Sequence, residues 1–245
     1  MMAAENPHTA ERAKIAFFDV DETVIRFKSM FRFQEYYHSK TGILPGFLGA
    51  YRYRSFLRAM DRYLSDGKPR EFINAQYYRG FQGRRRSTVR ALARQWFRDM
   101  RNGGESIYIP AVVDIIRRHQ ADGARIVLVS GSFVELLEPI AEELGVSHIL
   151  ATRLETLRDR YTGNILPPQM IGDGKAIAVR ALLAAEGVGA AESWAYGDHI
   201  SDIAMLEEVD HPNIVSRDPH MVALATERHW GLVDPLPDQE EEYHA

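Results

Sequence analysis

The chain has 245 residues, of which 45% are hydrophobic and 26% charged, with a formal net charge of −4. This composition is ordinary for a soluble globular protein and argues against extensive disorder. No apolar run approaches the roughly 20 residues of a membrane span, and the polar segment 1–12 lacks the apolar core of a secretory signal. The absence of cysteine excludes disulfides, thiol catalysis and cysteine-bound zinc, so a cytoplasmic location is the default expectation.

The first predicted element is a short buried strand over residues 15–20, which ends in two carboxylates one residue apart. Asp19 and Asp21 are followed by Thr23. Burying ionised groups costs several kcal/mol unless a cation or hydrogen bonds compensate. Mg²⁺ is an economical compensation, because it takes one or two carboxylates and leaves room for phosphate oxygens. The alternative is an acidic turn in which Thr23 caps the next helix.

A helical block follows. Apolar residues at three- and four-residue steps predict helices over 31–39, 47–63, 70–81 and 88–100. Residues 26–102 hold 18 Lys or Arg and 5 Asp or Glu, a balance of +13, whereas the rest of the chain carries −17. This basic surface either solvates the helices, attracts a small anionic substrate or binds nucleic acid. The acidic charge of the whole chain makes nucleic acid the least favoured of the three.

From Pro110 onward, helices and strands alternate. The predicted order is a helix to 120, a strand at 125–130, a helix to 144, a strand at 148–151, a helix from 175, a strand at 194–197, a helix after 201 and a strand at 213–215. Residues 154–165 predict a small antiparallel excursion that turns at 161–164. Such alternation indicates an α/β protein with a parallel sheet covered on both faces.

Polar residues follow three of these strands, where open parallel sheets bind their ligands. We expect Ser130 and Gly131 at the start of a helix, whose free N–H groups suit an anion. Asp198 and Asp202 are four residues apart and can share one rim. Lys175 opens a helix, where its charge opposes the helix dipole, and this indicates an anionic neighbour. Taken singly, each is also explained as a helix cap or a solvated charge.

Taken together, these residues resemble the four ordered motifs of the haloacid dehalogenase-like (HAD) phosphohydrolases. The motifs are Asp19-x-Asp21-x-Thr23, Ser130, Lys175 and Gly197-Asp198-x-x-x-Asp202, within residues 15–233. The helical block resembles the cap of the phosphoserine-phosphatase-like branch. The resemblance implies a Rossmann-like, doubly wound parallel sheet with an inserted all-helical cap domain. The implied divisions are a core of 12–25 and 105–235, a cap of 26–104 and an acidic flexible tail of 236–245.

The resemblance also implies a chemistry: a Mg²⁺-dependent phosphomonoesterase that hydrolyses a small phosphorylated metabolite through an aspartyl-phosphate. Asp19 is the implied nucleophile and Asp21 the acid and base. The other implied roles are phosphoryl binding by Ser130, Gly131 and Lys175, Mg²⁺ binding by Asp19, the backbone carbonyl of Asp21 and Asp198, and support from Thr23 and Asp202.

The chain departs from this pattern at Lys28, five residues after Thr23, where phosphoserine phosphatases carry a Glu that meets the substrate ammonium. Lys28 disfavours phosphoserine and favours a carboxylate or second phosphate, unless it is only an exposed hinge lysine. His199 stands where relatives often have Ser. We expect Lys28, Arg32 and Glu35 to take part in substrate selection.

Two other functions remain open at this level. One is transfer of the phosphoryl group to an acceptor other than water, favoured by a cap that excludes water. The other, much less favoured, is a non-catalytic polyanion-binding module that uses the basic block. The ratio of 25 Arg to 5 Lys is typical of a GC-rich bacterial gene. The sequence carries no signal of oligomeric state.

Overall fold

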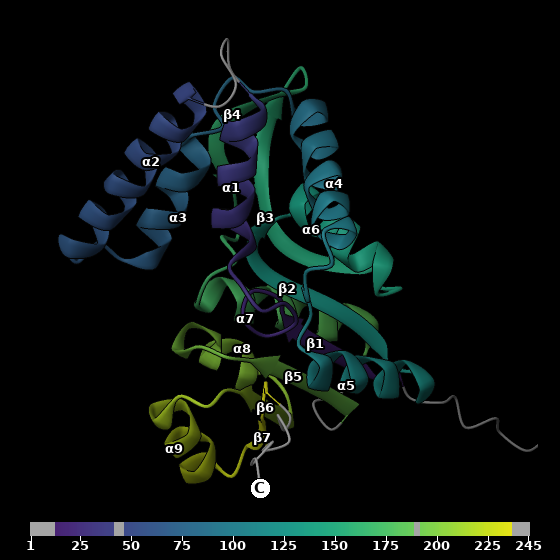
Figure 1. Cartoon of the computed structure of the whole chain (residues 1–245). Helices are drawn as coiled ribbons and strands as arrows, with labels where there is room; N and C mark the ends of the chain where they lie inside the picture. The colour runs from purple at the N-terminus through teal and green to yellow at the C-terminus, as the bar shows by residue number, and fades with distance from the viewer. Residues whose placement is uncertain (1–12, 42–46, 189–191, 237–245) are drawn as a thin grey trace, which may run out of the picture.

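The computed structural model describes residues 13–41, 47–188 and 192–236. Within them, one seven-stranded sheet has the order β4-β3-β2-β1-β5-β6-β7 (Figure 1). Neighbouring strands are parallel except for the β3–β4 pair. The strands are β1 (Ile15–Asp19), β2 (Arg125–Phe133), β3 (His148–Leu157), β4 (Arg160–Leu166), β5 (Ser193–Gly197), β6 (His211–Val215) and β7 (Gly231–Val233). This confirms the predicted α/β fold with a mostly parallel sheet.

Both faces of the central strand β1 are buried. Ile15 and Phe17 belong to one apolar cluster, and Ala16 and Phe18 belong to another on the opposite face. Successive side chains of a strand point to opposite faces, so a strand covered on both sides is a continuous apolar run. The first cluster includes residues of α7 (Asp173–Glu186), α8 (Ile203–Leu206) and α9 (Pro219–Arg228), and the second includes residues of α5 (Pro110–Ala121) and α6 (Val134–Glu143).

Between β1 and α5 the described residues form four helices, as predicted. They are α1 (Ser29–Lys40), α2 (Phe47–Ser65), α3 (Arg70–Arg79) and α4 (Arg86–Asn102). The insertion joins the second cluster directly: the rings of Phe33 in α1 and of Phe81, in the turn after α3, lie 5.9 and 5.6 Å from that of Phe133 in β2. These inserted helices therefore share their core with the sheet. No described helix is long and apolar enough to cross a membrane.

Helices α4 and α6 lie side by side and are joined by ion pairs (Figure 1). The pairs, each with an arginine from α4 and a glutamate from α6, are Arg86–Glu135, Arg90–Glu138, Arg94–Glu138, Arg94–Glu142 and Arg101–Glu143. Part of the charge separation seen in the sequence is thus structural, because arginines of the basic block pair with acidic residues outside it.

The antiparallel excursion exists, but its predicted turn at 161–164 is wrong. The chain turns at Arg158 and Asp159, which both have positive φ. Gly163 lies inside β4 with a φ of 91°, which strains any other residue, and a Cβ there would also approach Gln82 Cβ to 3.2 Å. Glycine is therefore required here although the chain does not turn. The Asp159 carboxylate accepts hydrogen bonds from Ser87 N at 3.0 Å and Ser87 Oγ at 2.6 Å, which fixes the turn on the first turn of α4.

Two elements were not predicted. Helix α9 and the short strand β7 follow β6, and β7 is largely exposed, so its residues show little apolar pattern. Of the predicted acidic tail 236–245, all but Leu236 lies outside the described residues.

Candidate active site

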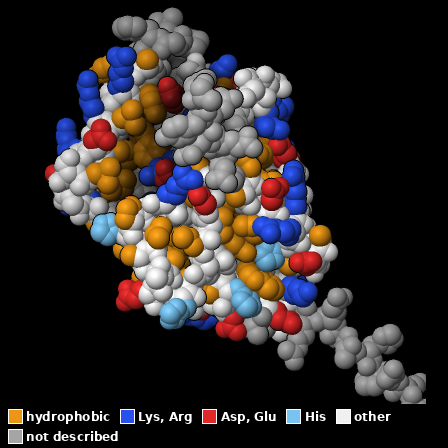
Figure 2. All heavy atoms as spheres, turned by 60° about the horizontal axis from the view of Figure 1, so that its bottom comes forward, with side chains coloured by type: hydrophobic (Ala, Val, Ile, Leu, Met, Phe, Trp, Pro, Cys, Tyr) orange, Lys and Arg blue, Asp and Glu red, His pale blue; other side chains and the backbone are white. Residues whose placement is uncertain are grey.

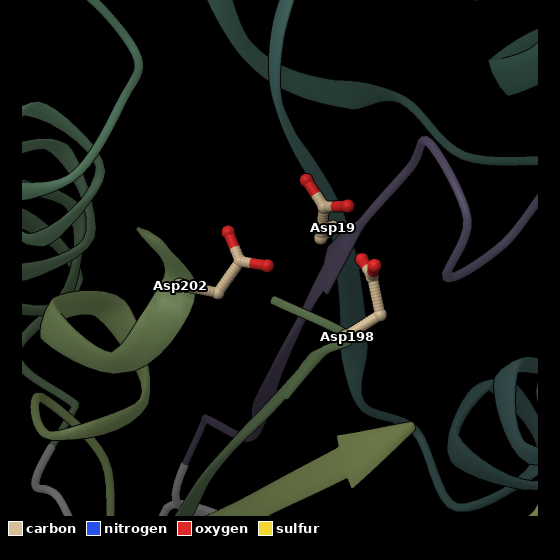
Figure 3. Close-up of side chains that lie close together, drawn as sticks. All are labelled: Asp19, Asp198 and Asp202. Carbon is tan, nitrogen blue, oxygen red and sulfur yellow. The ribbon is translucent and has the colours of Figure 1, made fainter. Parts of the chain in front are cut away.

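The predicted catalytic residues meet at the carboxyl edge of the sheet. Asp19 ends β1 and is in register with Val129 of β2, so Ser130 follows beside it. Asp198 directly follows Gly197, the last residue of the neighbouring strand β5. Figure 3 shows the carboxylates of Asp19, Asp198 and Asp202 gathered around one point. The parallel register alone brings together residues that are far apart in the chain.

Lys175, in the first turn of α7, reaches into this group. Its Nζ donates hydrogen bonds to Asp19 Oδ1 and, at 2.6 Å, to Asp202 Oδ1, with 5% of the lysine side chain exposed. Burial alone lowers the pKa of Lys175, but the two carboxylates outweigh it and raise the pKa above its usual value. Burial raises the pKa of Asp19 well above normal, against the opposing charge of Lys175. Lys175 therefore holds a positive charge beside the predicted nucleophile.

The three carboxylates fit a divalent cation. One oxygen from each of Asp19, Asp198 and Asp202 lies within 4.8 Å of the others. They are hard oxygen donors, and a single lysine neutralises three acids only in part. Both Asp202 oxygens already accept hydrogen bonds, from Lys175 Nζ and from His199 N at 3.2 Å. Asp19 and Asp198 are thus the better ligands, and Asp202 is placed to support them.

Asp198 is held by Thr23, whose Oγ1 donates to Asp198 Oδ1 at 2.9 Å. Burial, with the nearby charge of Asp202, raises the pKa of Asp198 to about 6. Thr23 is fully buried, so its hydroxyl has a fixed orientation. The close packing of this loop requires Gly197, because a Cβ there would lie 2.7 Å from Asp202 Cβ.

The Asp21 side chain lies apart from the three acids. Its Oδ1 accepts a hydrogen bond from Ser29 N at 3.1 Å, and its Oδ2 accepts one from Ser132 Oγ at 3.4 Å. The hydroxyls of Ser29 and Ser132 are 2.7 Å apart. Burial raises the pKa of Asp21, which favours a carboxyl group that keeps a proton to donate. Two acids one residue apart therefore have different environments.

Ser130 is buried at the site, but the prediction that it starts a helix is wrong. Strand β2 continues to Phe133 through an irregularity after Ser130, and α6 begins only at Val134. Ser130 Oγ accepts a hydrogen bond from Ser132 N at 3.0 Å. The helix dipole thus does not act at Ser130 as expected.

Gly131 is packed from both sides. A Cβ at Gly131 would lie 3.3 Å from Ile171 Cγ1. Its carbonyl accepts hydrogen bonds from Asn74 Nδ2 at 3.3 Å, Tyr78 Oη at 2.7 Å and Thr152 Oγ1 at 2.9 Å. Asn74 and Tyr78 belong to α3, so the inserted helices help to fix the segment that carries Ser130.

A cavity of about 390 Å³ opens above these groups. Asp19, Asp21, Ser130 and Lys175 line it, and residues of α1, α2 and α3 form its opposite wall. Lys28 also lines it and pairs with Glu22 at 3.3 Å. The inserted helices therefore contribute directly to the space in which a substrate would bind.

Two of the residues expected to select substrate lie elsewhere. Arg32 and Glu35 are exposed and are not among the described residues that line the cavity. Arg32 NH1 lies 2.5 Å from Glu105 Oε2, and its guanidinium group stacks on Phe27. Their proximity to the first motif in the sequence was misleading, because α1 turns this face away from the site.

Sequence reasoning missed Arg70, the first residue of α3. Arg70 NH1 lies 2.7 Å from His199 Nδ1 and 3.3 Å from Ser201 Oγ, so it joins α3 to the loop after β5. Ser29, Asn74 and Tyr78 were also missed. None of them belongs to a local motif, since each meets its partner only through the fold.

A family model for haloacid dehalogenase-like hydrolases matches residues 16–207, which include all of these groups. The chain belongs to this family. A probable phosphatase of Mycobacterium tuberculosis is 30% identical over 226 residues, covering 92% of this chain and 77% of the relative. The phosphoserine phosphatase SerB1 of the same organism is 29% identical over 228 residues, covering 89% and 70%. This HAD hydrolase is therefore a phosphatase of the phosphoserine-phosphatase-like branch.

Solved structures share the fold of this chain. A protein of unknown function from Bordetella pertussis has a TM-score of 0.79 and 25% identity, covering 92% of this chain and all of that one. A phospho-aspartyl intermediate analogue of phosphoserine phosphatase has a TM-score of 0.62 and 16% identity, covering 94% and 97%, and shows the shared fold. Because the chain is a phosphatase, the alternative of a non-catalytic polyanion-binding module is no longer needed.

Proposed function

We propose that the protein is a Mg²⁺-dependent phosphomonoesterase that hydrolyses a small phosphorylated metabolite through an aspartyl-phosphate. One observation carries the proposal: buried Lys175 binds both Asp19 and Asp202 at the floor of a cavity that Asp21 also lines. The arrangement supplies a nucleophile, a fixed positive charge and a separate proton carrier within one enclosed site.

In the first step, a carboxylate oxygen of Asp19 attacks the phosphorus and the ester P–O bond breaks. Asp21 donates its proton to the departing alcohol oxygen. Ser130 and Lys175 bind the phosphoryl oxygens, and Gly131 allows the backbone to approach them. The hydrogen bonds from Ser29 and Ser132 hold the Asp21 carboxyl group in place for the transfer.

In the second step, Asp21, now ionised, accepts a proton from a water molecule that attacks the phosphorus of the aspartyl-phosphate. The bond between the Asp19 oxygen and phosphorus breaks, which releases inorganic phosphate and restores both carboxyl groups. Dividing the reaction in this way replaces one difficult displacement by two easier ones.

Asp19 and Asp198 would hold the metal, with the backbone carbonyl of Asp21 as a third ligand. When bound, Mg²⁺ neutralises negative charge on the transferring phosphoryl group. Thr23 orients Asp198, and Asp202 positions Lys175. The oxygen-only donor set supports a hard cation over a softer metal.

We further propose that residues 26–104 act as a cap over this site. Helices α1, α2 and α3 form the wall of the cavity opposite Asp19. Arg70 binds the loop after β5, and Asn74 and Tyr78 bind the Gly131 carbonyl, so the cap contacts two of the catalytic loops. Such a cap limits the access of bulk solvent to the reacting phosphoryl group.

The test is phosphate release from a broad panel of phosphomonoesters, with Mg²⁺ and after chelation. We expect Mg²⁺-dependent turnover that Asp19→Asn abolishes, while Asp66→Asn, an exposed carboxylate outside the cavity, leaves it intact. Turnover by Asp19→Asn at the normal rate would refute the proposal. Product analysis with added alcohols separates hydrolysis from phosphoryl transfer, since transfer yields a new ester.

A further inference from the structure

The wall of the cavity that faces Asp19 is mainly apolar. Its apolar members, all from the inserted helices, are Met30, Phe31, Met60, Leu64, Ile73 and Tyr77, and Arg70 and Asn74 of α3 are its polar members. Figure 2 shows hydrophobic side chains gathered around a hollow on the side of α2 and α3. The cavity is continuous with the phosphate-binding groups, so whatever is esterified to the phosphate must lie against this wall.

Among these apolar wall residues, the hydroxyl of Tyr77 is already used in a hydrogen bond within the protein. Tyr77 Oη donates to the Met30 carbonyl at 2.8 Å, which leaves its ring to face inward. The ring of Phe31 lies 6.5 Å from that of Tyr77. Met30 and Met60 add flexible thioethers, which adapt to apolar ligands of different shape. A polar group placed against these apolar side chains would therefore lose hydrogen bonds to water without replacing them.

Of the three described charged groups of the cavity outside the catalytic set, two form an ion pair with each other and the third hydrogen-bonds to the loop after β5. Within the described residues, these groups are Glu22, Lys28 and Arg70. Glu22 pairs with Lys28 at 3.3 Å, and Arg70 binds His199 and Ser201. No unpaired carboxylate is left here to receive a substrate ammonium group.

We propose that the site selects phosphomonoesters whose leaving group is an uncharged apolar chain or ring. The inference rests on the proposed phosphatase function and adds the substrate class. Burying each additional methylene against the wall improves binding by about fourfold until the wall is covered. The phosphate supplies the charge at the floor, and the apolar body supplies the affinity above it.

The experiment measures kcat/KM for n-alkyl phosphates from ethyl to octyl, at concentrations below aggregation, together with phosphoserine and a carboxylated phosphate ester. The full chain is used with Mg²⁺. We expect kcat/KM to rise by about fourfold per methylene, with phosphoserine among the poorest substrates. A flat series, or a preference for phosphoserine or the carboxylated ester, would overturn the inference while leaving the phosphatase function intact. No release from any ester would refute both.

A matched pair of variants tests the wall itself. Leu64 lines the cavity and is 58% exposed, whereas Leu157, 68% exposed, lies at the end of β3 outside it. Because both are on the surface, neither substitution disturbs the core. We expect Leu64→Asp to lower the ratio of octyl to ethyl phosphate turnover by about tenfold, and Leu157→Asp to leave it unchanged. Equal ratios in the two variants would overturn the inference.

Discussion

Lys175 and Asp202 form a buried ion pair, with 2.6 Å between Nζ and Oδ1 and 5% and 2% of the two side chains exposed. The same Nζ binds Asp19. One lysine therefore links the nucleophile from β1 to a carboxylate from the segment after β5. Since buried charges are tolerated only when paired, loss of any one member would leave the others buried without compensation.

Removing the lysine charge should destabilise the protein strongly. We expect Lys175→Met to lower the free energy of unfolding by about 3–5 kcal/mol, because Asp19 and Asp202 then stay buried without their cation. Urea denaturation measures the change, with Lys40→Met, an exposed lysine, as control. Added Mg²⁺ should restore part of the loss. Equal stability of the two variants would contradict the pairing.

The different environments of Asp19 and Asp21 lead to a kinetic prediction. Asp21→Asn should slow hydrolysis of an alkyl phosphate by at least about 100-fold, because the alcohol leaves without a proton. An ester with a good leaving group, such as 4-nitrophenyl phosphate, needs no proton for the first step. Rapid mixing should then show a burst of 4-nitrophenol. Equal slowing of the first step for both esters would count against a proton-donor role.

The residues at the ends of the parallel strands could be predicted from sequence to share one site, because the fold brings these strand ends to the same edge of the sheet. Asp19, Ser130 and Asp198 each follow an apolar run, and the carboxyl ends of parallel strands share one edge. Ser29 and Ser132, in contrast, are 103 residues apart and meet through their side chains. Nothing local marks such a contact, so the supports of Asp21 were found only in the structure.

Metal binding should be visible without an activity assay. Mg²⁺ that binds only the folded protein adds about 2.7 kcal/mol at 100 times its Kd. We expect the Tm to rise with Mg²⁺ concentration and Asp198→Asn to weaken this dependence, because it removes one ligand charge. Asp66→Asn serves as the control. An identical Mg²⁺ response in Asp198→Asn would exclude Asp198 as a ligand.

Stability should fall on mild acidification, in part through His119. Burial lowers the pKa of His119 below its ordinary 6.5, and its Nε2 lies 2.9 Å from Tyr196 Oη. Below about pH 6.5 the unfolded chain takes up a proton that the folded chain resists, so protonation favours unfolding. Urea denaturation between about pH 7 and 5 should show a smaller decrease for His119→Gln. If His119→Gln lost as much stability on acidification as the unsubstituted protein, the loss would be due to other groups.

The ion pairs between α4 and α6 should contribute unequally to the stability of the fold. The side chain of Glu135 is 5% exposed, whereas that of Glu142 is 57% exposed. We expect Arg86→Ala to cost about 1–3 kcal/mol, because it leaves a buried carboxylate without its partner. Arg94→Ala should cost less than about 1 kcal/mol, as exposed pairs do. Thermal or urea denaturation ranks them, and a reversed order would contradict the burial of Glu135.

The basic block also shows a feature that the sequence pattern cannot predict, namely which residues its arginines pair with. The excess of arginine between 26 and 102 is visible in the sequence, but its partners on α6 are not, because the pairing depends on how α4 packs. The turn at Arg158 and Asp159 was hidden for a similar reason. Its residues are not glycine, and Asp159 adopts positive φ while bound to Ser87.

The most direct test of the mechanism is to stop the reaction in acid during turnover and map phosphate on the chain by mass spectrometry. Acid preserves an acyl-phosphate long enough for peptides to be analysed. We predict phosphate on the peptide that contains Asp19, only with Mg²⁺ and substrate, and its absence in Asp19→Asn. Rapid phosphate release with an adduct on a different residue, or with the same adduct in Asp19→Asn, would contradict the account.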